Sequence, residues 1–133
     1  MSGAAASTER ALAGHARSVL HRASEEAIQR AVVDLLSRAA RPGVAWTHMP
    51  AGDARAKGVG GKLKGLGTKA GWPDLVIVMA GQLYGLELKT NAGRVSPAQQ
   101  AAHAELVAAG AIVAVAYGLD QAMQQLKSWG VVR

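Results

Sequence analysis

The chain of 133 residues has no cysteine, few prolines and no long apolar run. Without cysteine, neither a disulfide framework nor a thiolate-ligated zinc or iron site is possible, so any metal must be bound by carboxylates or histidine. No stretch approaches the roughly 20 apolar residues of a membrane span. The first residues also lack the charged start and apolar block of a secretion signal. We therefore expect a soluble protein of the reducing cytoplasm.

Half of the residues are apolar and 18% are charged, which is a globular composition. The net charge of +6 is unevenly distributed, because residues 41–70 contain six basic residues and one acidic residue. Residues 1–40 contain five basic and four acidic residues, and residues 71–133 contain four of each. A concentrated basic segment favours a polyanionic partner such as nucleic acid, although charge alone fits a solvated loop equally well.

The hydrophobic pattern predicts one α/β domain over residues 24–133, preceded by a weakly helical extension over residues 1–23. Helices are expected over residues 24–41, 96–110 and 119–130, with Ser24 and Ser96 as N-caps. Strands are expected over residues 44–49, on both sides of a tight turn within residues 74–90, and over residues 112–117. The order α-β-β-β-α-β-α, with a long Gly- and Lys-rich loop over residues 50–71, predicts a mixed sheet of about four strands flanked by helices. The helical crossover makes the last strand parallel to the strand before it.

The predicted hairpin "GWPDLVIVMAGQLYGLELKT", residues 71–90, carries three charged residues among apolar neighbours. A two-residue turn at Ala80-Gly81 or Gly81-Gln82 would place Asp74, Glu87 and Lys89 on one face of the sheet. A three-residue loop or a bulge would turn Asp74 to the other face. The length of the turn therefore decides whether the three charges can form one site.

Two carboxylates close together on a partly buried surface repel each other and lose hydration, and a divalent cation between them resolves this conflict. Oxygen ligands without thiolates suit Mg²⁺ or Mn²⁺, and Lys89 can orient or deprotonate a water beside a phosphate. Alone, a Pro-Asp pair is often only a turn, and Glu-x-Lys is often a surface ion pair. Here Glu87 and Lys89 alternate with Leu86 and Leu88 in a strand expected inside the sheet, where unpaired charges are unusual. The pattern indicates hydrolysis of a phosphodiester.

Five fragments in order, "SEEAIQ", "KLKGLGTKAGWPDLVIV", "LYGLELKT", "GRVSPAQ" and "LVAAGAIVAVA", together resemble the VRR-NUC domain, a branch of the PD-(D/E)XK nuclease superfamily. The resemblance covers residues 24–129 and implies the restriction-endonuclease-like core of that superfamily. It implies that Asp74 and Glu87 bind one or two Mg²⁺ or Mn²⁺ ions, with Lys89 as the catalytic lysine. It further implies that Glu25 is an additional metal-binding acid and that Gln99, from the S-P-x-Q motif, is a polar residue of the site.

Neighbouring residues offer alternatives to two of these assignments. Glu26 could take the place of Glu25, but Glu25 shares a helix face with Gln29, the last residue of the E-x-x-I-Q pattern. Gln100 could be mistaken for Gln99, and the S-P-x-Q motif favours Gln99.

The segment "GVGGKLKG" resembles a phosphate-binding loop only superficially. Ala56 stands where the pattern G-x-x-x-x-G-K-[ST] requires its first glycine, and Leu63 stands where it requires a hydroxyl, so no nucleotide cofactor is expected. We interpret the segment as a basic flap that contacts DNA phosphates without reading sequence. Its basic residues are Arg55, Lys57, Lys62, Lys64 and Lys69.

Two further residues have open interpretations. Trp72 is either a core residue or a residue that stacks on a displaced base, and the core interpretation is favoured. His103 is interpreted as a packing or phosphate-contacting residue rather than a metal ligand, because no second histidine lies at ligand spacing.

The sequence thus predicts a Mg²⁺- or Mn²⁺-dependent DNA endonuclease without a membrane partner. Stand-alone members of the VRR-NUC family resemble Holliday-junction resolvases, tend to be homodimers and often belong to phages or prophages. The resemblance therefore implies a homodimer that acts on branched DNA in bacterial or phage replication, recombination or repair, in the cytoplasm of a bacterial or phage-infected cell. A non-catalytic nucleic-acid-binding module and a phage assembly subunit are the alternatives.

Overall fold

The computed structural model describes residues 25–50 and 59–133, so the predicted N-terminal extension and the Ser24 cap lie outside the described residues. A helix over residues 25–39 opens the described chain. It is followed by β1 (Val44–His48), α2 (Val59–Gly65), β2 (Leu75–Met79), β3 (Gln82–Lys89), α3 (Pro97–Ala108), β4 (Ile112–Tyr117) and α4 (Leu119–Trp129). The predicted order of strands and helices is confirmed, with α2 as an addition.

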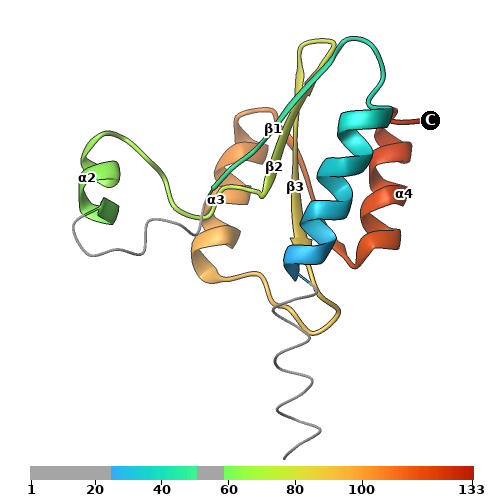
Figure 1. The fold of residues 1–133 in the computed structure, drawn as a ribbon. Helices are drawn as coiled ribbons and strands as arrows, with labels where there is room; N and C mark the ends of the chain where they lie inside the picture. The colour runs from blue at the N-terminus through green and yellow to red at the C-terminus, as the bar shows by residue number, and fades with distance from the viewer. Residues whose placement is uncertain (1–24, 51–58) are drawn as a thin grey trace, which may run out of the picture.

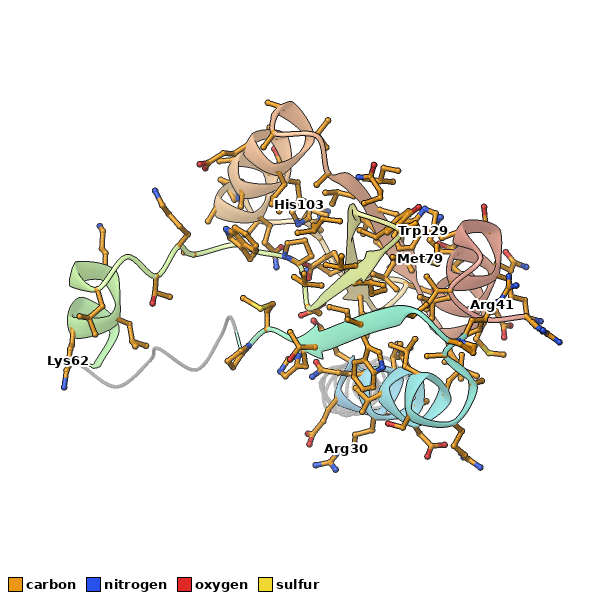
Figure 2. All side chains as sticks on the ribbon, turned by 90° about the horizontal axis from the view of Figure 1, so that it is seen from above. Arg30, Arg41, Lys62, Met79, His103 and Trp129 are labelled. Carbon is orange, nitrogen blue, oxygen red and sulfur yellow. The ribbon has the colours of Figure 1, made fainter. Side chains whose placement is uncertain are left out.

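The four strands form one mixed sheet in the order β1-β2-β3-β4. The pairs β1–β2 and β2–β3 are antiparallel, and β3–β4 is parallel, as the crossover through α3 requires. The helix of residues 25–39 and α4 lie side by side on one face of the sheet (Figure 1), and α3 covers the other face (Figure 2). The sheet is therefore enclosed between two helical layers, as an α/β sandwich.

The β2–β3 hairpin closes through a two-residue turn at Ala80-Gly81. Ala80 and Gly81 have φ angles of 52° and 77°, which match the left-handed turn that suits the twist of an antiparallel hairpin. The register pairs Met79 with Gln82 and Leu75 with Leu86. It thus places Asp74, the residue before β2, opposite Glu87, and the predicted even-length turn is confirmed.

The two faces of the sheet differ in chemistry because side chains alternate along each strand. Leu86 and Leu88 of β3 point into the main core, and each contributes about 1.5–3 kcal/mol of burial free energy. The positions between and beside them, Gly85, Glu87 and Lys89, belong to the face covered by α3. The buried core residues are Val32, Leu36, Leu75, Ile77, Leu86, Leu88, Ala116, Ala122, Leu126, Val131 and Val132.

The loop predicted over residues 50–71 contains a short helix, α2, which the sequence pattern did not reveal. Its end is closed by Gly67, whose φ is 98°, and by the Thr68 N–H, which donates to Leu63 O at 2.9 Å. Leu63 of this helix is only partly buried, and Leu66 just beyond it is 74% exposed. Hydrophobic periodicity cannot detect such a helix, because the signal arises from burial against a core.

In the part of the chain that the structure describes, no helix combines the length and apolar character needed to cross a membrane.

Candidate active site

A cleft of about 1260 Å³ opens at one end of the sheet. The helix of residues 25–39 lines it from Glu25 to Ser37, together with the end of β1, the segment before β2 and the first turn of α3. Its lining includes most of the polar residues that the sequence singled out, namely Glu25, Gln29, Asp74, Glu87 and Gln99. Lys89 lies beside Glu87 at the buried side of this cleft.

Asp74 is held by contacts on both its side chain and its backbone. Its Oδ2 accepts the Leu88 N–H at 2.7 Å. Because Asp74 precedes β2, its carboxylate here replaces the strand carbonyl that would otherwise accept this N–H. The preceding Pro73 is fully buried and packs against Gly85, where an added Cβ would lie 2.7 Å from Pro73 Cγ. The β2–β3 pairing and this close contact together fix the position of Asp74.

Glu87 is a buried carboxylate, with only 1% of its side chain exposed. Its Oε2 lies 3.2 Å from Gln99 Nε2 and 3.6 Å from Lys89 Nζ, whereas its Oε1 has no hydrogen-bond partner. The pKa of Glu87 is raised to about 8, first by burial and then by the neighbouring Asp74 carboxylate, while Lys89 acts in the opposite direction. The conflict between two close carboxylates, expected from the hairpin register, is therefore present in the fold.

Gln99 connects the start of α3 to Glu87. Ser96 caps the helix by accepting the Gln99 N–H at 3.2 Å, and Gln99 Oε1 accepts the Ser96 N–H at 2.9 Å, which forms a capping box. Because the Ser96 N–H is a donor, the amide oxygen must face it and the amide nitrogen must face Glu87. Pro97 occupies the first helical turn, as predicted. The S-P-x-Q motif thus caps a helix and supplies a donor to Glu87 through the same side chain.

The chemistry of Asp74 and Glu87 fits a hard divalent cation. Both are oxygen donors, Glu87 Oε1 is a buried acceptor without a partner, and a positive charge would relieve the repulsion that raises the Glu87 pKa. Within residues 25–50 and 59–133, no group of three or more His, Cys, Asp or Glu side chains is clustered closely enough to hold a metal. The two carboxylates and Lys89 are brought together, while Glu25 is not gathered into the same cluster.

Glu25 and Glu26 both line the cleft and are exposed. The Glu26 carboxylate pairs with Arg30 at 2.9 Å along the helix surface. Gln29 Nε2 lies 2.9 Å from His48 Nδ1 and 3.1 Å from His48 Nε2. The assignment of Glu25 as a further metal ligand therefore stays a prediction.

His48 is a residue of the cleft that sequence reasoning missed. Its Nδ1 lies 3.0 Å from Asp74 O, which can only accept; with the proton on Nδ1, the ring donates to this carbonyl and His48 Nε2 accepts from Gln29 Nε2, 3.1 Å away. The same carbonyl accepts the Met49 N–H at 2.7 Å. His48 therefore ties the end of β1 to the backbone of Asp74. The alternation of β1, which turns Trp46 and His48 inward, was the signal available in the sequence.

The remaining candidate residues are those of the basic segment, Trp72 and His103. Lys62, Lys64 and Lys69 are exposed, and Arg55 and Lys57 lie outside the described residues. Trp72 is partly buried and lines a separate cavity of about 420 Å³ near α3 rather than the cleft. His103 points its Nε2 at Glu87 Oε1, 3.6 Å away.

Comparison with known proteins identifies the fold. The model of the VRR-NUC domain family matches residues 23–120. A solved structure described as a VRR_NUC domain protein is similar with a TM-score of 0.64 and 25% sequence identity, covering 78% of this chain and 85% of that one. A second, described as a VRR_NUC domain, has a TM-score of 0.53 and 19% identity, covering 79% of this chain and 95% of that one. A search of curated proteins finds no match.

The mixed sheet lies between helical layers, and the chain matches the model of the VRR-NUC domain family. Together with the similar solved structure, these findings define a nuclease-type domain. The chain belongs to the VRR-NUC domain family.

Proposed function

We propose that this protein is a Mg²⁺- or Mn²⁺-dependent endonuclease that hydrolyses DNA phosphodiester bonds. The observation that carries the proposal is the pairing of Asp74 with Glu87 across the hairpin, at an open cleft, with Lys89 Nζ 3.6 Å from Glu87 Oε2. A structural role alone does not account for Glu87, because a buried carboxylate with an elevated pKa and an unpartnered oxygen is a cost to the fold.

Each residue of the site has a distinct role in this proposal. Asp74 and Glu87 hold one or two divalent cations, and Glu25 adds a carboxylate from the helix of residues 25–39, which lines the same cleft. A bound cation would lower the pKa of an attacking water and polarise the phosphate. Lys89 orients that water and offsets the charge that develops on the phosphate. Gln99 keeps the Glu87 carboxylate in place.

The basic segment supplies the affinity for DNA in this proposal. Lys62 and Lys64 of α2, and Lys69 after it, are exposed and precede Gly71, which lines the cleft. Figure 1 shows α2 set apart from the sheet on the side where this segment returns to β2. Phosphate contacts from lysines confer affinity without sequence readout, which suits an enzyme that recognises DNA shape.

Branched DNA, such as a Holliday junction, is the proposed substrate. A junction is resolved by two symmetric cuts, so the proposed active species is a homodimer with one site per protomer. The proposed setting is phage or bacterial replication, recombination or repair. Sedimentation of the protein with and without a four-way junction tests the dimer separately from catalysis.

The direct test is incubation of the full chain with a labelled four-way junction, and with linear duplex of the same sequence, in Mg²⁺, in Mn²⁺ and in EDTA. We expect metal-dependent cleavage that prefers the junction, and loss of cleavage in Asp74→Ala and Lys89→Ala. Lys127→Ala, which removes an exposed charge on α4, serves as the control and should cleave normally.

Three outcomes would contradict the proposal in different ways. Binding without cleavage in either metal would favour a non-catalytic nucleic-acid-binding module, and no binding at all would favour an assembly subunit. Cleavage that persists unchanged in Asp74→Ala and Lys89→Ala would place the active site elsewhere.

A further inference from the structure

His103 lies on α3 one helical turn beyond Gln99, so the two side chains share the face that covers β3. Its side chain is 12% exposed, and its Nε2 lies 3.6 Å from Glu87 Oε1. Among residues 25–50 and 59–133, Glu87 Oε1 and His103 Nε2 are the buried side-chain polar atoms that lack a hydrogen-bond partner. The two atoms without partners therefore face each other.

The chemistry of the two atoms is complementary. An ionised carboxylate oxygen can only accept, and an imidazole nitrogen that carries a proton can donate to it. Buried polar atoms in folded proteins are rarely left without a partner, because the loss of hydration is then uncompensated. Contacts within active sites are often longer in the free protein than in the complex with substrate, so a separation of 3.6 Å is compatible with a hydrogen bond that tightens on binding.

We propose that His103 is a positioning residue of the site, which donates its Nε2–H to Glu87 Oε1 while Gln99 Nε2–H donates to Glu87 Oε2. Helix α3 then supplies one donor to each oxygen of the same carboxylate, from positions four residues apart. The plane of the carboxylate is fixed, and its remaining lone pairs are directed at the cleft. The consequence for catalysis rests on the proposed function, whereas the hydrogen bond itself does not.

The surroundings of His103 favour a donor over a metal ligand. Its Nε2 is buried, and the ring is not part of the cleft lining. Hydrogen bonds from neighbouring groups to metal-binding carboxylates are the usual way in which such ligands are oriented.

The position of the proton on the ring tests the hydrogen bond without any assumption about catalysis. The spectrum is recorded on the full, metal-free chain at pH 9.5, where an ionised carboxylate can only accept. Long-range ¹H–¹⁵N correlations of ¹⁵N-histidine-labelled protein, assigned with His103→Gln, should show the His103 proton on Nε2. A proton on Nδ1 would overturn the proposal.

A matched pair of variants tests the effect on the reaction. His103→Gln retains a donor near the position of Nε2, and His103→Met has a similar length without a donor. For junction cleavage in Mg²⁺ we expect kcat of His103→Met to fall about 10- to 100-fold with little change in KM, and His103→Gln to recover to within about threefold of the unmodified protein. Glu105→Met, an exposed position on the same helix, is the control.

The outcomes separate this inference from the proposed function. If the unmodified protein cleaves and both His103 variants cleave equally well, or are equally impaired, His103 acts only through packing and the inference is wrong. If the unmodified protein does not cleave in Mg²⁺ or Mn²⁺, the proposed function fails, and the proton position still decides whether His103 donates to Glu87.

Discussion

Gln99 Nε2 lies 3.2 Å from Glu87 Oε2, and the opposite end of the same amide accepts the Ser96 N–H at 2.9 Å. One side chain thus links the cap of α3 to the buried carboxylate of β3. The position of α3 and the orientation of Glu87 are therefore coupled, and a change at Gln99 should affect both stability and catalysis.

Gln99→Met should remove both hydrogen bonds while it preserves the length of the side chain. We expect the free energy of unfolding to fall by about 0.5–2 kcal/mol, as for a lost helix cap, and junction cleavage to fall about 10-fold or more. Gln100→Met is the matched control, because Gln100 is exposed and its side chain donates to the nearby Val95 O. Urea unfolding and cleavage rates measure the two effects. Equal behaviour of the two variants would contradict the role of Gln99.

The raised pKa of Glu87 should make the stability of the metal-free protein depend on pH. In the folded state the Glu87 carboxyl stays protonated up to about pH 8, whereas in the unfolded chain it ionises near pH 4.5. The stabilising contribution is therefore complete below the unfolded pKa and is lost as pH rises through the folded pKa. In EDTA, the melting temperature should fall over this range, and Glu87→Gln should flatten the fall. An unchanged pH dependence in Glu87→Gln would show that Glu87 does not titrate in this way.

Magnesium should reverse this loss of stability, because the ion binds the ionised carboxylates of the folded state only. At a pH above about 8, addition of Mg²⁺ should raise the melting temperature of the unmodified protein and leave that of Glu87→Gln nearly unchanged. Calorimetry at increasing Mg²⁺ concentrations measures the shift. An equal shift in both proteins would indicate that Mg²⁺ binds elsewhere.

Gly85→Ala should disturb Asp74 through Pro73. An added Cβ at Gly85 would lie 2.7 Å from Pro73 Cγ, in a region that is fully buried. We expect a loss of about 1–3 kcal/mol in unfolding free energy, as for an overpacked core, together with reduced cleavage. Gly65→Ala is the stability control, since no atom of the described residues lies within 4 Å of its added Cβ. Equal stability of the two variants would argue against the close packing of Pro73 on β3.

The lysines of α2 should contribute to DNA affinity through charge alone. Lys62→Ala and Lys64→Ala should each weaken binding to junction and duplex alike, and each should reduce the slope of log Kd against log salt by about 0.9. Fluorescence anisotropy at several salt concentrations measures this slope. Lys127→Ala on α4 controls for the loss of one positive charge. A slope that changes as much in Lys127→Ala as in the α2 variants would exclude a specific role for α2.

The hairpin and its charged face could be predicted because their determinants are local. The small residues Ala80 and Gly81 favour a two-residue turn, and strict alternation along β3 then places Glu87 and Lys89 on the face opposite Leu86 and Leu88. The capping signals of α3 are equally local, since Ser96 and Pro97 lie beside the helix that they begin. Short-range chemistry was sufficient for these elements.

The contacts that complete the site could not be predicted, because they join residues distant in the chain. His48 meets Asp74 O and Gln29 only after β1 pairs with β2 and the helix of residues 25–39 packs on the sheet. The direction of the His103 ring depends on how α3 lies on β3. Helix α2 escaped detection for a different reason, since its glycines and lysines are atypical of a helix that packs on a core, and Leu66 just beyond it is exposed.

The most direct test of the paired-carboxylate site is Asp74→Asn, measured as Mg²⁺-dependent cleavage of a four-way junction. The amide oxygen of asparagine can still accept the Leu88 N–H, so the fold is preserved while the negative charge opposite Glu87 is lost. We predict a protein that retains its far-UV circular dichroism spectrum and loses cleavage by at least about 100-fold. Cleavage by a folded Asp74→Asn at the rate of the unmodified protein would contradict the account.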